Sequence, residues 1–317
     1  MEKRNLGQSG LEAAPLAFGG NVFGWTADEA TSFTLLDAFV AEGFNLIDTA
    51  DVYSRWAPGN KGGESEAIIG KWLKRSGKRD KVVIVTKVGM ELSPTQKGLS
   101  KAYILKEVEE SLKRLQTDYI DLYLSHKDDE TTPQLETLQA YAQLINEGKV
   151  RAIGASNFSA TRLGEALQIS KEHDLPRYEV LQPLYNLYDI DFQDELAPLC
   201  MANNIGVISY FSLASGFLTG KYRSEADLSK SPRGQGVKKY MNKRGFHILS
   251  IMDEIAQHYN TTPVSVALAW LIAQPVVTAP IASATNLNQL HELMQAVNLK
   301  LDKGALHKLE TAARQQN

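Results

Sequence analysis

Short apolar segments alternate with helical patterns along nearly the whole chain, and this alternation restricts the possible folds more than any other feature. Each segment has the length of a buried strand and is followed by apolar residues at helical spacing. Eight strands are predicted, at residues 16–18, 44–47, 82–85, 119–124, 150–153, 180–181, 207–208 and 276–281. Strands separated by helices run parallel with right-handed crossovers, and eight of them close naturally into a (β/α)8 barrel, the TIM barrel.

The rest of the pattern is consistent with one α/β domain over residues 1–317, because no linker or low-complexity segment interrupts it. A turn at Gln8-Ser9-Gly10 predicts an N-terminal β-hairpin. A doubly wound open sheet is the alternative fold, but the segment Leu16 to Gly24 lacks the G-x-G-x-x-G that such a sheet carries when it binds a dinucleotide. Helices are predicted near 36–40 and at 66–73, 104–115, 135–145, 163–170, 192–202, 248–259 and 264–273.

Composition excludes several classes of function. With 34 Lys+Arg against 37 Asp+Glu, the net charge is −3, which argues against nucleic acid or an anionic membrane as the main partner. The single cysteine, Cys200, excludes an intramolecular disulfide and fits a reducing compartment. The first residues form no apolar leader, and no stretch reaches the ~18 apolar residues of a membrane span. We therefore expect a cytoplasmic protein.

Ionisable side chains stand at the ends of three consecutive predicted strands. Asp48 ends the second strand, Lys87 the third and His126 the fourth, and Tyr53 lies in the loop five residues after Asp48. In a barrel these ends face one mouth, where active sites lie. One such residue would be consistent with a helix cap or turn, but a buried charge is costly, so four together indicate function.

The four side chains have complementary chemistry. A phenol has a pKa of about 10, which makes proton donation difficult at neutral pH. An adjacent ammonium lowers that pKa, and a carboxylate keeps the ammonium charged and oriented. A neutral imidazole orients a carbonyl or assists proton transfer. Tyr53 with Lys87, Asp48 and His126 is therefore predicted to act as a general acid for carbonyl reduction.

The same residues carry a resemblance to the aldo-keto reductase family, in motifs that occur in order from about Leu6 to Leu293. The motifs are Asp48-Thr49-Ala50-Asp51-Val52-Tyr53, Val85-Thr86-Lys87, the run from Asp118 to His126, Gly154-Ala155-Ser156-Asn157-Phe158, Gln182-Pro183-Leu184-Tyr185-Asn186 and Gly216-Phe217-Leu218-Thr219-Gly220-Lys221-Tyr222. The resemblance implies a (β/α)8 barrel and NADPH-dependent reduction of aldehydes or ketones, with Tyr53 as the proton donor.

The resemblance also implies positions for the cofactor. Ser156, Asn157 and Gln182 would hold the nicotinamide carboxamide, and Tyr210 would stack on the nicotinamide ring. The pyrophosphate would be surrounded by Ser212, Leu213, Gly216, Leu218 and Lys221, where small residues and backbone amides suit a phosphate. Taken alone, Gly216 and Gly220 fit simple turns better than a ligand site. The remaining cofactor positions are Gly19 and Gly20 after the first strand and Ser283 and Gln289 after the last.

The sequence departs from the family pattern in two places. Lys127-Asp128 replaces the frequent Trp-Pro after the histidine, so this rim of the substrate pocket is unusual. The segment from Ile281 to Asn286, followed by Gln289, has no Lys or Arg to pair with a 2′-phosphate. NADP(H) is expected as the cofactor, and NAD(H) stays open. The segment from Lys221 to Arg244, with eight Lys and Arg against two acids, is predicted to be a mobile basic loop that could compensate.

Substrate and partner are less constrained. Trp25 and Trp56 follow the first and second strands and either line a pocket for apolar or aromatic carbonyl compounds or pack on neighbouring helices. The histidines other than His126 show no metal-ligand spacing, so no metal is expected. A cofactor-binding regulatory or channel-associated subunit with little turnover is the alternative to an enzyme. Neither the substrate nor the oligomeric state follows from the sequence.

Overall fold

The strands form a closed barrel in the computed structural model, which describes residues 2–315. All neighbouring strands are parallel, in the order β10-β3-β4-β5-β6-β7-β8-β9; the bounds are β3 Ala17–Gly19, β4 Leu46–Asp48, β5 Val83–Val88, β6 Ile120–Ser125, β7 Val150–Ser156, β8 Tyr178–Gln182, β9 Gly206–Val207 and β10 Ile281–Ala282. The Ile281 amide donates to the Ser209 carbonyl at 2.8 Å, and Val277 pairs with Val207. These contacts join the last strand to the seventh, and the predicted (β/α)8 barrel is confirmed.

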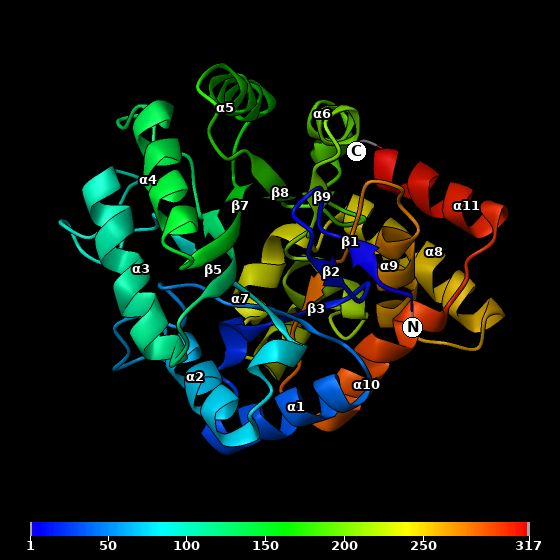
Figure 1. Cartoon of the computed structure of the whole chain (residues 1–317). Coiled ribbons are helices and arrows are strands. Elements are labelled where there is room, and N and C mark those ends of the chain that lie inside the picture. Colours follow the sequence, from blue (N-terminus) through cyan, green and yellow to red (C-terminus); the bar gives the residue numbers. More distant parts are fainter. Residues whose placement is uncertain (1, 316–317) are drawn as a thin grey trace.

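The predicted N-terminal hairpin is also present. Strands β1 (Arg4–Asn5) and β2 (Glu12–Ala13) pair antiparallel. Leu6 and Ala13 are fully buried and pack with the residues that point into the barrel, such as Leu46 and Val180. The hairpin therefore covers the end of the barrel at which the strands begin, as Figure 1 shows in blue.

Most helices surround the barrel on its outer side, whereas the short α7 packs among the turns after β9 (Figure 1). Their bounds are α1 Glu29–Ala41, α2 Glu64–Ser76, α3 Lys101–Leu115, α4 Gln134–Asn146, α5 Ala160–Glu172, α6 Leu196–Ala202, α7 Gly234–Val237, α8 Lys243–His258, α9 Pro263–Ile272, α10 Leu287–Gln295 and α11 Lys303–Arg314. Side-chain hydrogen bonds explain where many of these helices begin. The Ser100 hydroxyl accepts from the Tyr103 amide before α3, and the Thr262 hydroxyl accepts from the Ser265 amide before α9, whose first residue is Pro263.

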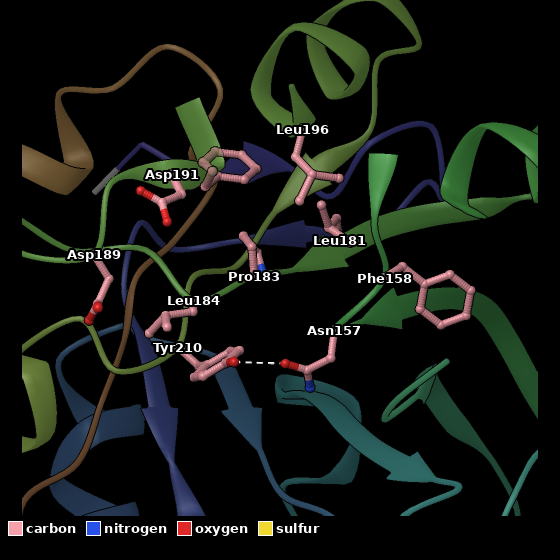
Figure 2. Close-up of a pocket in the computed structure, with 10 residues that line it drawn as sticks. Asn157, Phe158, Leu181, Pro183, Leu184, Asp189, Asp191, Leu196 and Tyr210 are labelled. Atoms are coloured by element: carbon pink, nitrogen blue, oxygen red, sulfur yellow. Dashed lines mark hydrogen bonds between the residues drawn. The ribbon is translucent and has the colours of Figure 1, made fainter. Parts of the chain in front are cut away.

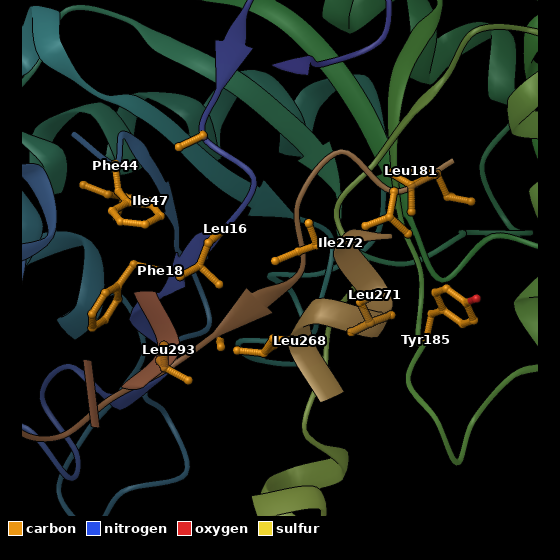
Figure 3. Packing of buried hydrophobic residues seen from close by; sticks show 14 of the residues in the cluster. Leu16, Phe18, Phe44, Ile47, Leu181, Tyr185, Leu268, Leu271, Ile272 and Leu293 are labelled. Atoms are coloured by element: carbon orange, nitrogen blue, oxygen red, sulfur yellow. The ribbon is translucent and has the colours of Figure 1, made fainter. Parts of the chain in front are cut away.

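The main core lies between the outer faces of the strands and these helices. Phe18, Ile47 and Leu181 point outward from three strands, and Leu268 and Leu293 approach from α9 and α10 (Figure 3). This continuous apolar layer fixes the strand ends in space, and the functional side chains stand on those ends.

The last strand is shorter than predicted. The apolar run at 276–281 suggested a strand of that length, but only Ile281 and Ala282 form it. Pro280 has no N–H and cannot donate to a ladder. The Thr278 and Ala279 amides both point to the Val207 carbonyl, which is incompatible with regular pairing.

The helix predicted at 192–202 and the loop predicted at 221–244 also need correction. The helix predicted at 192–202 is a 3-10 turn, Asp191–Gln193, followed by the separate short helix α6. The basic segment 221–244 contains two 3-10 turns, Glu225–Lys230 and Lys238–Tyr240, on either side of α7. Its mobility stays a prediction.

One stability prediction follows from the hairpin. Gly7 has a φ of 60°, and a Cβ atom there would lie 2.2 Å from the Glu179 carbonyl oxygen. We expect Gly7→Ala to lower the free energy of unfolding by about 3 kcal/mol or more, because backbone strain and a steric clash add. Gly10→Ala is the matched control, since Gly10 has a φ of 75° but nothing within 4 Å of its Cβ position. Gly10→Ala should lower the free energy of unfolding by only about 1 kcal/mol. Urea denaturation measures both variants. Equal losses would show that the close packing at Gly7 is unimportant.

Within residues 2–315, no helix is both long enough and apolar enough to cross a membrane.

Candidate active site

Three of the predicted ionisable residues meet at the mouth formed by the strand ends. Asp48 is the last residue of β4, Lys87 lies near the end of β5, and His126 follows β6 directly. Lys87 is 0% exposed, and Asp48 and His126 are also buried. Tyr53 lies in the loop after β4, and the Thr49 and Asp51 amides tie the start of this loop to β5 carbonyls. The predicted convergence is therefore observed.

Lys87 connects the cluster. Its Nζ contacts Asp48 Oδ1 at 2.8 Å and donates to the Thr49 carbonyl at 2.7 Å and to the Tyr53 hydroxyl at 3.1 Å. An ammonium has three donors, and each has an acceptor here. Gln182 donates from Nε2 to Asp48 Oδ1 at 2.8 Å and so helps to hold the carboxylate in place.

The charges in this cluster act on each other. Burial disfavours the Lys87 ammonium, but the Asp48 carboxylate and the Tyr53 oxygen outweigh it and raise the pKa of Lys87 above its ordinary value. Burial also raises the pKa of Tyr53, and Lys87 offsets this only in part. Lys87 therefore acts in the predicted direction, but burial outweighs it, and the pKa of Tyr53 in the free protein stays above its usual value. Tyr53 holds its proton, and Lys87 makes that proton easier to lose than it would otherwise be.

His126 is held neutral beside Tyr53. Burial, and then the positive charge of Lys87, lower its pKa well below the ordinary value for histidine. The two rings have centroids 5.9 Å apart at 71°. No residue within 2–315 bonds to His126 Nδ1, which is buried. A neutral imidazole here can exchange a hydrogen bond with a carbonyl group placed over Tyr53.

The three residues expected to hold a carboxamide lie next to the cluster. Ser156 donates to the Gln182 carbonyl at 2.9 Å, and Asn157 donates to the His126 carbonyl at 2.9 Å. The Tyr210 hydroxyl donates to Asn157 Oδ1 at 2.7 Å, as Figure 2 shows. Ser156, Asn157 and Gln182 thus form one polar group beside Lys87 and Asp48, with Tyr210 next to it.

A cavity of about 260 Å³ also borders Tyr210 (Figure 2). It is mostly apolar and is lined by Asn157, Phe158, Leu181, Pro183, Leu184, Asp189, Asp191, Phe192, Leu196 and Tyr210. Burial, then the charge of Asp189 and then that of Tyr53, raise the pKa of Tyr210. Tyr210 therefore interacts with both the cavity and the Lys87 cluster.

The segment after β9 has an unusual backbone. Phe211, Ala214 and Ser215 have φ values of 51°, 48° and 57°, and Gly216 has 102°. Successive left-handed residues turn backbone N–H groups toward one side, an arrangement that suits anions and that is found at functional sites. Ser212 and Leu218 are buried, whereas Lys221 is exposed and forms no ion pair within the described residues.

The residues expected after the first and last strands lie close together. A Cβ atom on Gly19 would lie 2.5 Å from Ser283 Oγ, and one on Gly20 would lie 2.9 Å from the Asp48 carbonyl. These glycines are therefore required for packing of the strand ends. Ser283 bonds to the Asn21 side chain at 2.6 Å. Gln289 accepts from the Thr285 amide at 2.9 Å at the start of α10.

One cation of the basic segment reaches this mouth. The Asn21 side-chain amide is oriented so that both its nitrogen and its oxygen form hydrogen bonds. The nitrogen donates to Ser283 Oγ, and the oxygen accepts from Arg233 Nη2 at 2.9 Å. The Arg233 guanidinium also lies 5.3 Å from the centre of a Trp25 ring. Burial lowers the pKa of Arg233, and the oxygens of Tyr222 and Tyr53 oppose this. Arg233 thus places one positive charge beside Asn21 and Trp25 at this mouth.

Both predicted tryptophans lie in one aromatic cluster with Tyr53. Trp56 contacts Tyr53 with ring centroids 5.5 Å apart, and Trp25 contacts Trp56 edge to face at 5.9 Å. Trp56 is 46% exposed, so part of it is free to contact a ligand. At the opposite rim, Asp128 is paired with Arg162 at 2.7 Å and is not a free carboxylate.

Comparison with known proteins agrees with this geometry. The model of the aldo/keto reductase family matches residues 15–314, which is almost the whole chain. The chain belongs to the aldo/keto reductase family.

Relatives within the aldo/keto reductases bear names that indicate different functions. Aldo-keto reductase YhdN of Bacillus subtilis (strain 168) is 34% identical over 95% of this chain and 90% of its own length. A probable voltage-gated potassium channel subunit beta of Arabidopsis thaliana is 33% identical over 94% and 92%. L-glyceraldehyde 3-phosphate reductase of Escherichia coli (strain K12) is 30% identical over 94% and 88%.

Members of the aldo/keto reductase family bind NAD(P)(H), and the residues present fit such a group. Amide and hydroxyl groups of Ser156, Asn157 and Gln182 suit a carboxamide, because they offer both donors and acceptors. The left-handed turn after β9 and the Arg233 guanidinium suit a pyrophosphate.

Sequence reasoning missed Arg233 and Asn21 as site residues of this aldo/keto reductase. The basic composition of 221–244 was a signal for the first, but it did not show which cation faces the mouth. Asn21 follows the Gly19-Gly20 pair directly, and this position at a strand end was its only signal. Among the described residues, no three His, Cys, Asp or Glu side chains are grouped as metal ligands.

Proposed function

We propose that this chain reduces aldehydes or ketones to alcohols with NADP(H), and that Tyr53 donates the proton. The observation that carries the proposal is the connected series of contacts from Asp48 through Lys87 Nζ to the Tyr53 hydroxyl, at 2.8 and 3.1 Å. The coarser conclusion, an oxidoreductase of the aldo/keto reductase family, already follows from the family match.

The residues have separate roles in this reaction. The bound cofactor supplies the hydride. His126, which is neutral, orients the carbonyl oxygen toward Tyr53. As Tyr53 gives its proton to that oxygen, Lys87 stabilises the phenolate that forms, and Asp48 keeps Lys87 charged and in place. Asp48, Lys87 and His126 are buried, and exclusion of water around them strengthens the attraction between Lys87 and the phenolate.

The substrate side of the mouth favours flat or aromatic carbonyl compounds. The Trp25–Trp56 pair lies beside Tyr53 and offers aromatic surface for stacking. The name of the Escherichia coli relative indicates small phosphorylated aldehydes as a second class. A panel of aromatic, aliphatic and phosphorylated aldehydes of similar size, measured by steady-state NADPH consumption, compares the two.

The alternative proposal is a cofactor-binding subunit with little turnover. It is supported by the Arabidopsis thaliana relative, whose name is that of a potassium channel subunit. The same panel separates the two proposals, because a regulatory subunit would bind NADPH without sustained consumption on any aldehyde. The intact Asp48–Lys87–Tyr53 contacts favour the enzyme.

Arg233 provides a prediction for cofactor binding. Because Arg233 lies near Tyr53 at the mouth, we expect it to contact the pyrophosphate that NADPH and NADH share. Arg233→Ala should weaken the binding of NADPH and of NADH by about 10- to 100-fold each, the effect of losing a charge-assisted hydrogen bond. Fluorescence quenching gives both dissociation constants. A selective loss of NADPH binding would instead place Arg233 at the 2′-phosphate.

Two further variants complete this comparison. Lys221→Ala should also weaken cofactor binding while leaving the melting temperature unchanged, because Lys221 is exposed beside the left-handed turn. Lys239→Ala is the control, since Lys239 is an exposed cation of the same segment that lies over Tyr240. If Lys239→Ala weakened binding as much as Arg233→Ala, the effect would be one of net charge alone.

A further inference from the structure

A buried carboxyl group without a side-chain partner lies behind the catalytic tyrosine. Asp51 is 0% exposed, and within residues 2–315 no side chain donates a hydrogen bond to either of its carboxyl oxygens. Its backbone amide donates to the Lys87 carbonyl, and Tyr53 follows two residues later. Asp51 is thus part of the segment that holds the proton donor, but the mechanism above does not use its side chain.

The surroundings of Asp51 contain too little positive charge for another carboxylate. Glu66 and Glu107 are buried nearby, and both bind Arg114, each at 2.6 Å. Glu66 also accepts from the Thr86 hydroxyl at 2.6 Å. One guanidinium therefore already serves two carboxylates, and an ionised Asp51 would be an uncompensated buried charge.

The groups that act on Asp51 come from every element packed around it. They are Glu66 on α2, Glu107, Arg114 and Tyr103 on α3, Tyr123 on β6, Tyr141 on α4 and Tyr53 on its own loop. The hydroxyls of Tyr103 and Tyr123 are buried and, like the Asp51 carboxyl, have no partner within 2–315. Burial, followed by the charges of Glu66 and Glu107, raises the pKa of Asp51 well above its ordinary value. Arg114 and the Val52 amide oppose this with smaller effects.

We propose that Asp51 carries a proton in the working enzyme and acts as a positioning residue for Tyr53. Its neutral carboxyl keeps a further negative charge away from Tyr53, so that Lys87 can stabilise the phenolate formed during proton donation. An ionised Asp51 would oppose that phenolate, as its charge raises the pKa of Tyr53. This role rests on the proposed function, but the protonation of Asp51 is tested without any activity measurement.

The first test is the pH dependence of stability. Asp51 has a higher pKa in the folded chain than the value of about 3.9 expected when unfolded, so unfolding releases a proton between these two pH values. Stability is then lost as pH rises through this window. Asp51→Asn has no proton to release, so the ratio of wild-type to variant unfolding constants should rise by up to tenfold per pH unit. Urea denaturation between pH 5 and 9 measures this ratio.

The matched control is Asp121→Asn. Asp121 is also buried, but two guanidinium groups contact it, Arg79 at 2.8 Å and Arg151 at 2.9 Å, whereas Asp51 has no such partner. Its ratio of unfolding constants should not rise with pH over this range. A flat ratio for Asp51→Asn as well would overturn the proposal.

An infrared measurement tests the proton directly. The wild-type spectrum at pH 7 should contain a C=O band of a protonated carboxylic acid, and this band should be missing in Asp51→Asn. If Asp51→Asn does not fold, Glu66→Gln serves instead. This variant frees Arg114 from Glu66, so Arg114 can stabilise an ionised Asp51. The carboxylic acid band should then disappear at a lower pH than in the wild type. Absence of the band from the wild type, in the folded protein at pH 7, contradicts the proposal.

The activity test adds the link to Tyr53. In Asp51→Asn the alkaline loss of kcat for aldehyde reduction should move to higher pH, with no shift in KM. If the infrared band and the pH dependence of stability are found but the pH profile of kcat does not move, Asp51 is protonated but does not influence Tyr53. If no variant or wild type reduces any aldehyde, the proposed function fails, while the stability and infrared results still decide the state of Asp51.

Discussion

Tyr53→Phe should reduce the rate of carbonyl reduction by roughly 10²-fold or more, the usual effect of losing a general acid. The change removes only the hydroxyl that lies 3.1 Å from Lys87 Nζ. The ring contacts with Trp56 and His126 remain, so cofactor and substrate should still bind. Single-turnover reduction of one good aldehyde, after NADPH binding has been confirmed, measures the chemical step without product release.

Tyr141→Phe is the control for Tyr53→Phe. Tyr141 is a fully buried tyrosine with a bonded hydroxyl, but its partner is Ser125 and it lies on α4, outside the Lys87 cluster. Its rate of reduction should be that of the wild type. If Tyr53→Phe also turned over at a near-normal rate, Tyr53 would not be the proton donor, and the cluster would serve only to stabilise the barrel mouth.

Lys87→Met should affect both activity and stability. Without the ammonium the phenolate is not stabilised, so the rate should again fall by roughly 10²-fold or more. Asp48 would lose its ion-pair partner while buried, which typically costs about 3–5 kcal/mol of folding free energy. Lys87→Met combined with Tyr53→Phe should be only about as slow as the slower single variant, because residues that act as one unit are not additive.

A second substitution separates these two effects of Lys87→Met. Adding Asp48→Asn removes the buried carboxylate, so the double variant should recover much of the lost stability in urea denaturation but none of the lost activity. Recovery of activity together with stability would mean that Lys87 supports the fold and has no direct part in proton donation.

The barrel was predictable because its signal is spread along the chain. Eight strand segments separated by helical patterns leave few possible topologies, and the error at 276–281 concerned only the length of one strand. That error has a local cause, since apolar composition favoured a strand while Pro280 and the shared Val207 carbonyl limited its pairing. The turn 191–193 ahead of α6 was missed because the helical spacing of its apolar residues continues through it.

The site was predictable where residues stand at strand ends and less so elsewhere. Asp48, Lys87 and His126 are placed by the barrel itself. Arg233 lies 12 residues beyond Lys221 in a segment without strands, so its approach to Asn21 depends on turns that the sequence pattern does not specify. The net rise in the pKa of Tyr53 was not foreseen, because the sequence showed its charged neighbour but not the loss of solvent around the phenol. Asp51 was visible in the motif, but its lack of a partner could be seen only in three dimensions.

The pairing of β10 with β3 has a consequence for synthesis on the ribosome. Ala17 pairs with Ile281, about 260 residues later, and Arg4 bonds to the Ile272 and Val277 carbonyls. One edge of the nascent sheet therefore stays unpaired until nearly the whole polypeptide has emerged, and contacts of such sequence separation form slowly. Exposed strand edges favour aggregation, and β3 limits this hazard because it has only three residues. Truncation shortly before Ile281 should therefore yield a chain that depends on chaperones to stay dispersed.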